Sequence, residues 1–138
     1  MPMRSLVLLS LAFIALFPAT KISAATLTGA IRDDATGQLL PARLYIRAQT
    51  GQWHFARSAD SAGRAVEYRK QRGDKSVEMH TALSAHPFVV ELAAGKYTLT
   101  VERGKEYHPA EREIEVGDQP INVELRLKRW INMAQSGW

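Results

Sequence analysis

The chain has 138 residues, of which 46% are hydrophobic, so it is long and apolar enough to bury one core of its own. It carries 18 basic and 14 acidic residues, and the resulting net charge of +4 is too small to indicate a nucleic-acid-binding protein. There is no cysteine, which excludes a fold held by disulfides and an enzyme with a cysteine nucleophile.

The amino-terminal segment has the pattern of a secretory signal peptide. Arg4 supplies a short positive region, and Leu6 to Phe17 form an almost uninterrupted apolar run of 12 residues. This run is shorter than the ~20 residues of a membrane-spanning helix, and small residues suited to cleavage follow it. We predict cleavage after Ala24 or Ala25, a leader over residues 1–25, export to the periplasm or cell exterior, and no stable membrane insertion afterwards.

Short stretches of alternating apolar and polar residues follow, each bounded by turn residues. They predict strands over residues 26–32, 40–48, 52–57, 88–92, 97–102, 113–116 and 121–127. About seven such strands in residues 26–128 indicate an all-β fold, an antiparallel β-sandwich of the transthyretin-like or immunoglobulin-like kind.

The stretch from Pro87 to Arg103 gives the strongest of these patterns. Its two alternating runs flank Ala94 and Gly95, which favour a tight turn, so we predict a β-hairpin. The hydroxyl of Tyr97 is expected to bond a nearby backbone group and stabilise this corner.

The segment from Val66 to His86 does not show this alternation of apolar and polar residues. It is rich in charges and has Gly73 and Asp74 at its middle, so we expect an excursion from the sandwich, either an extra hairpin or an ordered loop.

Histidines in and near this excursion are candidate metal ligands. Glu78 and His80 would point to the same face of a strand, with His86 and His54 as further donors, and imidazole with carboxylate suits zinc. No rigid spacing connects His80 to His86, so structural, hydrogen-bonded histidines are the favoured interpretation. We predict no metal and no other cofactor.

Two further groups are candidate binding residues. Trp53 and Phe55 form either a sugar-stacking platform or part of the core. A basic group either binds an anionic ligand, a polysaccharide or another domain, or is a solvated loop, which the interrupting acidic residues favour; it comprises Arg57, Arg64, Arg69, Lys70, Arg72 and Lys75.

The last ten residues, 129–138, form a tail or linker rich in apolar side chains. Trp130, Met133 and Trp138 would be exposed on a free terminus. We expect them to pack against the sandwich or a following domain, or to form a single helical turn over one end of the sheet.

Three stretches resemble the carboxypeptidase-regulatory-like, or transthyretin-like, domain: LTGAIRDDATGQLLPARLYI (27–46), SADSAG (58–63) and ELAAGKYTLTVE (91–102). Residues 67–116 with LKRWINMAQSGW (127–138) more narrowly resemble the amino-terminal region of CehA/McbA-type metallohydrolases, which carry a PHP-type domain after such a sandwich. The resemblance implies a metal site just past a Gly-Trp like Gly137-Trp138. The sequence contains no motif of that hydrolase domain, so no catalytic residue is carried over.

Three functions follow as hypotheses, none of them enzymatic. The first is a non-catalytic exported accessory domain for a metal-dependent hydrolase, in the same or a separate polypeptide, that docks through residues 66–86 and 129–138. The second is a stand-alone module that binds glycan or protein, with Trp53, Phe55 and Arg69 exposed. The third is a small metal-binding protein that uses His80 and His86. Nucleophile-elbow, phosphate-loop and His-Glu-x-x-His motifs are all lacking.

Overall fold

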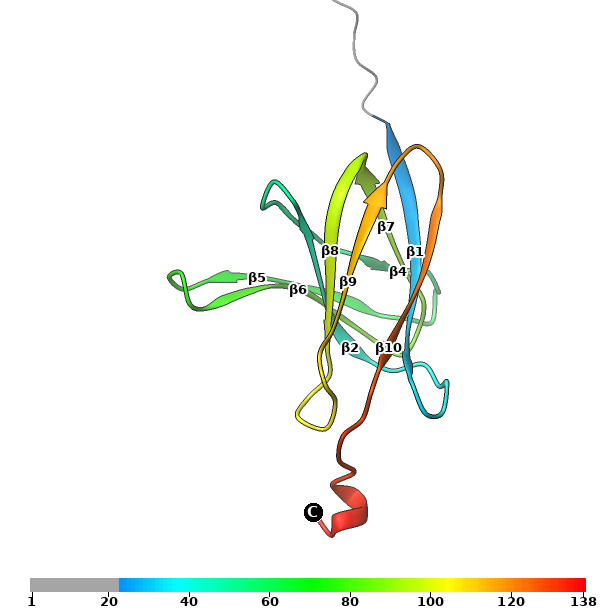
Figure 1. The fold of residues 1–138 in the computed structure, drawn as a ribbon, viewed down its shortest axis with the longest axis vertical. Coiled ribbons are helices and arrows are strands. Elements are labelled where there is room, and N and C mark those ends of the chain that lie inside the picture. Colours follow the sequence, from blue (N-terminus) through cyan, green and yellow to red (C-terminus); the bar gives the residue numbers. More distant parts are fainter. Residues whose placement is uncertain (1–22) are drawn as a thin grey trace, which may run out of the picture.

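The protein is a β-sandwich, described by a computed structural model over residues 23–138 (Figure 1). Because most strands alternate buried and exposed side chains, each sheet has one apolar face, and the two apolar faces close on each other. The elements are β1 (Ala24–Asp33), β2 (Ala42–Ala48), β3 (Trp53–His54), β4 (Arg57–Ser58), β5 (Ala65–Gln71), β6 (Val77–Leu83), β7 (Phe88–Ala93), β8 (Gly95–Glu102), β9 (Ala110–Val116), β10 (Ile121–Leu127) and the 3₁₀ turn η1 (Ala134–Ser136).

Two sheets are present. The four-stranded sheet has the order β10-β1-β7-β4, and the six-stranded sheet has the order β5-β6-β2-β8-β9, with β3 pairing to the end of β2. All pairs are antiparallel except β1 with β10, which run parallel with Leu27 opposite Ile121 and Asp33 opposite Leu127. The predicted β-sandwich is therefore confirmed, with β1 and β10 as the one parallel pair among the described strands.

The core lies between the sheets and is built from the inward side chains that the alternation predicted. Gly29 of β1 also lies in this core. The position leaves no room for a side chain, because a Cβ atom there would overlap the ring of Phe88 on the neighbouring strand. The largest fully buried side chains are Phe88, Leu27, Leu44, Ile46, Leu92, Leu99, Leu127, Val101 and Thr81.

The predicted hairpin over Pro87–Arg103 is wrong in its pairing. The tight turn is present, and the Tyr97 hydroxyl donates a 2.8 Å hydrogen bond to the carbonyl of Ala93, as expected. However, β7 pairs with β1 and β4, while β8 pairs with β2 and β9. The turn is an arch between the two sheets, so the apolar faces of β7 and β8 meet across the core instead of lying side by side.

The predicted third strand, residues 52–57, is split in two. Its first part, β3, joins the six-stranded sheet, and its last part, β4, joins the four-stranded sheet. The chain crosses between them at Ala56, whose buried N–H donates to Thr81 Oγ1 at 3.0 Å. Together with the two strands of the excursion, this split raises the count from about seven strands to ten.

The excursion is a hairpin, one of the two forms expected. β5 and β6 pair from Ala65–Leu83 out to Gln71–Val77, and Gly73 has a φ of 72° in the turn, a left-handed conformation that glycine tolerates. Figure 1 shows this hairpin projecting sideways from the sandwich as an arm.

The start of β1 and the carboxy-terminal tail lie at opposite ends of the sandwich (Figure 1). At the tail end, the Tyr107 hydroxyl donates to Asp33 Oδ2 at 2.8 Å and accepts from Arg129 at 2.7 Å. Asp33 Oδ1 accepts two backbone N–H groups in the turn after β1. This Asp33–Tyr107–Arg129 network ties the turn after β1, the loop before β9 and the chain after β10 together.

Hydrogen bonds to the loop before β9 fix the path of the tail beyond this network. The indole N–H of Trp130 donates to the carbonyl of Lys105 at 2.6 Å, and the N–H of Met133 donates to the Glu106 carboxylate at 2.8 Å. Trp130 is 58% exposed and Trp138 is 88% exposed, so the expected packing of these rings against the sandwich is wrong. A single helical turn, the alternative, is present as η1, but it has no buried residue and extends beyond the sandwich instead of covering the end of the sheet (Figure 1).

Most of the predicted leader lies outside the described residues, and its cleavage stays a prediction. Ala24 and Ala25, at the predicted cleavage point, are the first two residues of β1. Nowhere in residues 23–138 does the chain form a helix with the length and hydrophobicity needed to cross a bilayer.

Candidate binding surface on the six-stranded sheet

The outer face of the six-stranded sheet carries a row of aromatic rings. Leu44 and Ile46 of β2 point into the core, so Tyr45 between them points outward. The antiparallel registers place three more rings beside it, from three different strands: His80 of β6, Tyr68 of β5 and Trp53 of β3. We call these four residues the ring row.

Neighbouring rings of the row are in contact. Tyr68 and His80 stack with centroids 4.9 Å apart and planes only 11° apart. His80 and Tyr45 are 5.0 Å apart, and Tyr45 and Trp53 are 6.4 Å apart with an interplanar angle of 63°. Such contacts between aromatic rings stabilise their arrangement by more than the burial of apolar area alone. The rings of the row are therefore fixed in place without a ligand.

His80 is held in its neutral form at the centre of the row. It is only 3% exposed, and burial lowers its pKa, an effect that Glu78 partly opposes. The Glu78 carboxylate lies 3.3 Å from Nδ1 of His80, although this buried nitrogen has no hydrogen-bond partner among the described residues. Glu78 and His80 do share a face, as the sequence predicted.

The structure does not bring the other histidines to this pair. His86 lies after β6, where its Nδ1 is 2.9 Å from Ser84 Oγ, and His54 packs edge-on against Tyr97 at 5.4 Å. Over residues 23–138, no group of three or more histidine, cysteine, aspartate or glutamate side chains is placed to hold a metal ion.

Three hollows lie along the sheet near the ring row. The Trp53 hollow, of about 370 Å³, is bounded by side chains of four strands: Tyr45, Arg47, Trp53, Thr98, Thr100, Glu102 and Glu111. The Tyr68 hollow, of about 320 Å³, lies towards the tip of the arm and is lined by Tyr68, Lys70, Arg72, Ser76 and Glu78.

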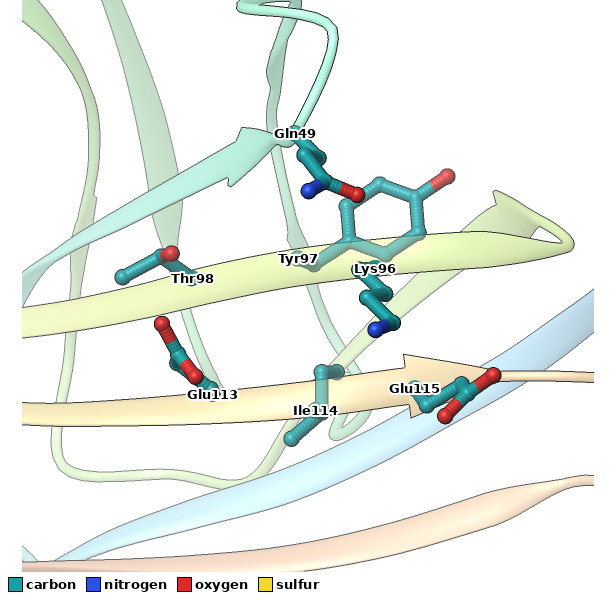
Figure 2. Close-up of a pocket in the computed structure, with 7 residues that line it drawn as sticks. All are labelled: Gln49, Lys96, Tyr97, Thr98, Glu113, Ile114 and Glu115. Atoms are coloured by element: carbon teal, nitrogen blue, oxygen red, sulfur yellow. The ribbon is translucent and has the colours of Figure 1, made fainter.

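The third hollow adjoins the Trp53 hollow through Thr98, which lines both. It measures about 400 Å³ and is lined by Gln49, Lys96, Tyr97, Thr98, Glu113, Ile114 and Glu115 (Figure 2). Figure 2 shows Thr98 of β8 beside Glu113 of β9, its register partner. Tyr97 is buried and its hydroxyl is bonded to the backbone, and this hollow offers both polar and apolar surface.

Charged side chains of both signs surround the Trp53 hollow. The Arg47 guanidinium lies 5.2 Å from the centre of the Trp53 ring, and the Tyr45 hydroxyl lies 3.4 Å from Glu102 Oε2. Burial, and then the nearby Glu102 charge, raise the pKa of Tyr45, so its hydroxyl stays protonated and available as a donor.

The sequence-predicted binding residues do not form one surface. Trp53 and His80 belong to the ring row, whereas Phe55 and Arg69 contact each other, with 3.9 Å between the guanidinium and the ring. Arg69 also pairs with Glu67 at 2.8 Å. Arg72 lines the Tyr68 hollow, next to one end of the ring row. The remaining predicted residues lie apart: His86 in the loop after β6, and Trp130 and Trp138 in the tail.

Tyr45 and Tyr68 are the row members that sequence reasoning did not assign to a site. Tyr45 stands between Leu44 and Ile46 in the predicted strand over residues 40–48, and Tyr68 stands next to Arg69 and Lys70 in the excursion. What places them in one row is the pairing of β5, β6 and β2, which involves residues far apart in the sequence. The chain matches no protein-family model and no curated protein. The assignment of the ring row as a candidate binding surface therefore depends on the geometry of this structure alone.

Proposed function

We propose that this protein is a non-catalytic exported binding domain whose ligand docks on the outer face of the six-stranded sheet. The observation that supports this function is the ring row with its adjoining hollows. Tyr68 is 40% exposed at one end of the row, and the Trp53 hollow opens at the other. Aromatic rings that are already fixed in place bind a ligand with little further loss of side-chain entropy.

Nuclear magnetic resonance titration of the isotope-labelled protein tests this function. The probes are a neutral, an anionic and a cationic polysaccharide, and a purified PHP-type metallohydrolase domain. At least one probe should shift the resonances of ring-row residues, and the Tyr45→Ala variant should weaken that binding. Shifts confined to the outer face of the four-stranded sheet, or no shifts with any probe, would contradict the proposal.

The accessory role beside a metal-dependent hydrolase is a second candidate, and the tail favours it. Trp130, Met133 and Trp138 expose apolar surface, while hydrogen bonds to Lys105 and Glu106 fix the path of the chain that carries them. Ordered, exposed apolar groups of this kind are typical of docking residues. The same titration separates the two roles, because binding of the hydrolase domain should shift the indole resonances of Trp130 and Trp138, whereas a ligand confined to the ring row should leave those two indoles unchanged.

A further inference from the structure

We propose that the Trp53 hollow is a binding site for a neutral pyranose within an oligosaccharide. This inference rests on the proposed function, because it assigns a ligand class to one part of the outer face. The hollow has the volume of a small ligand site, since such pockets measure about 300–1,000 Å³.

Two aromatic rings line the hollow. Tyr45 and Trp53 contact each other edge to face, with their planes inclined at 63°. A pyranose has a face of C–H groups that packs on an aromatic ring, and a rim of hydroxyl groups that must be hydrogen-bonded.

The polar lining supplies partners for that rim. Thr98 and Thr100 of β8 point outward beside the carboxylate of Glu111, and Arg47 adds a donor. The bond from Thr100 Oγ1 to Glu111 Oε2 is 3.4 Å long, as is the one from Tyr45 to Glu102. Such long bonds are weak, so these groups can exchange them for hydroxyl groups of a ligand at small cost.

The mixed charge of the hollow favours an uncharged ligand. The lining holds two carboxylates, Glu102 and Glu111, and one guanidinium, so a charged sugar of either sign meets at least one like charge, and an anionic sugar meets two. The hydroxyl groups of a neutral sugar can form hydrogen bonds with all three groups. The adjoining hollow, shared at Thr98 and shown in Figure 2, has room for a neighbouring sugar unit and is also lined by polar groups.

The test compares neutral hexasaccharides (cellohexaose, xylohexaose, mannohexaose and maltohexaose) with polygalacturonate and chitosan hexaose, by titration calorimetry and resonance mapping. At least one neutral probe should bind and shift the Trp53 indole and the Thr98 and Thr100 amides. Trp53→Ala should weaken this binding about tenfold or more, whereas Trp53→Phe, which keeps a ring, should restore most of it. Trp138→Ala is the matched control, because that indole lies in the tail, and its affinity should be unchanged.

The outcomes distinguish this inference from the proposed function. Binding of a charged polysaccharide, or shifts at Tyr68 that are insensitive to Trp53→Ala, would overturn the pyranose site while leaving the outer face as a binding surface. Shifts absent from the whole outer face would overturn both. The denaturation midpoint of each variant checks that a loss of binding reflects the site and not unfolding.

Discussion

Two buried polar side chains, Asp33 and His80, show how environment sets their charge. Asp33 is 6% exposed, and the hydrogen bond from Tyr107 is the main cause of its lowered pKa, followed by backbone N–H groups, so it remains a carboxylate. His80 also has a lowered pKa, but burial is the main cause, so it remains uncharged. The surroundings of each side chain therefore favour one charge state, the ionised form of Asp33 and the neutral form of His80.

Removing the Tyr107 hydroxyl should destabilise the fold. Tyr107→Phe leaves Asp33 without its side-chain donor and Arg129 without its acceptor, so the free energy of unfolding should fall by about 1–3 kcal/mol. Chemical denaturation measures this change, and Tyr68→Phe, on the exposed arm, is the control. Equal effects of the two substitutions would contradict the role of the network.

Because Asp33 has a lowered pKa in the folded state, its contribution is present above the usual value of 3.8 and is lost as the pH falls below it. Tyr107→Phe should therefore also make stability less dependent on pH in this acidic range. A wild-type slope in the variant would show that the hydroxyl does not set the pKa of Asp33.

The histidines predict a second loss of stability, at milder pH. Burial lowers the pKa of both His54 and His80, so below about 6.5 the unfolded chain binds protons that the folded chain resists. The free energy of unfolding should therefore fall as the pH decreases from 7 to 5. Denaturation curves of His80→Phe should show a smaller decrease, with the remainder due to His54, and an unchanged slope in His80→Phe and His54→Phe together would refute this origin.

At the scale of the elements, the close contact between β1 and β7 depends on a residue without a side chain. Gly29→Ala would place a methyl group into Phe88 and Val123, and this overpacking should cost about 1–3 kcal/mol or more. Gly117→Ala is the matched control, because that position is open and its φ is not in the left-handed region. Thermal unfolding of the two variants compares them directly, and similar midpoints would show that β1 and β7 can move apart.

Alternation along the sequence predicted where strands lie but not which strands pair. Phe88, Val90 and Leu92, and then Tyr97, Leu99 and Val101, alternate in the same way whether their strands form a hairpin or an arch. The arch places these two sets across the core from each other, and only the partners β1 and β2, more than 40 residues away, decide between the two arrangements. Likewise, no local signal showed that residues 52–57 change sheets at Ala56.

The candidate site illustrates the same limit. Trp53 and His80 are visible in the sequence as candidate residues, but their membership in one row follows from three registers, including Tyr68 opposite His80. Phe55, two residues after Trp53, was expected to lie with it, either on a sugar-stacking platform or in the core, but it contacts Arg69. A surface assembled across strands is therefore hard to predict from local patterns, because register sets which side chains meet.

At the scale of the whole molecule, the last strand should be essential and the tail dispensable. Removing residues 131–138 takes away no buried residue, so the free energy of unfolding should change by no more than about 0.5 kcal/mol. Removing residues 121–138 also deletes β10 with its buried Val123, Leu125 and Leu127, each of which contributes about 1.5–3 kcal/mol of burial. Circular dichroism melts should show cooperative unfolding for the first deletion and none for the second.

The parallel pairing of β1 with β10 also determines how the domain responds to mechanical tension. Seven residue pairs join the two strands, and the start of β1 and the tail beyond β10 lie at opposite ends of the sandwich (Figure 1). Traction applied to the two termini would thus slide the strands along each other and load their hydrogen bonds together, in shear, instead of opening them one after another. The domain should therefore resist extension when its two termini are pulled apart in this direction.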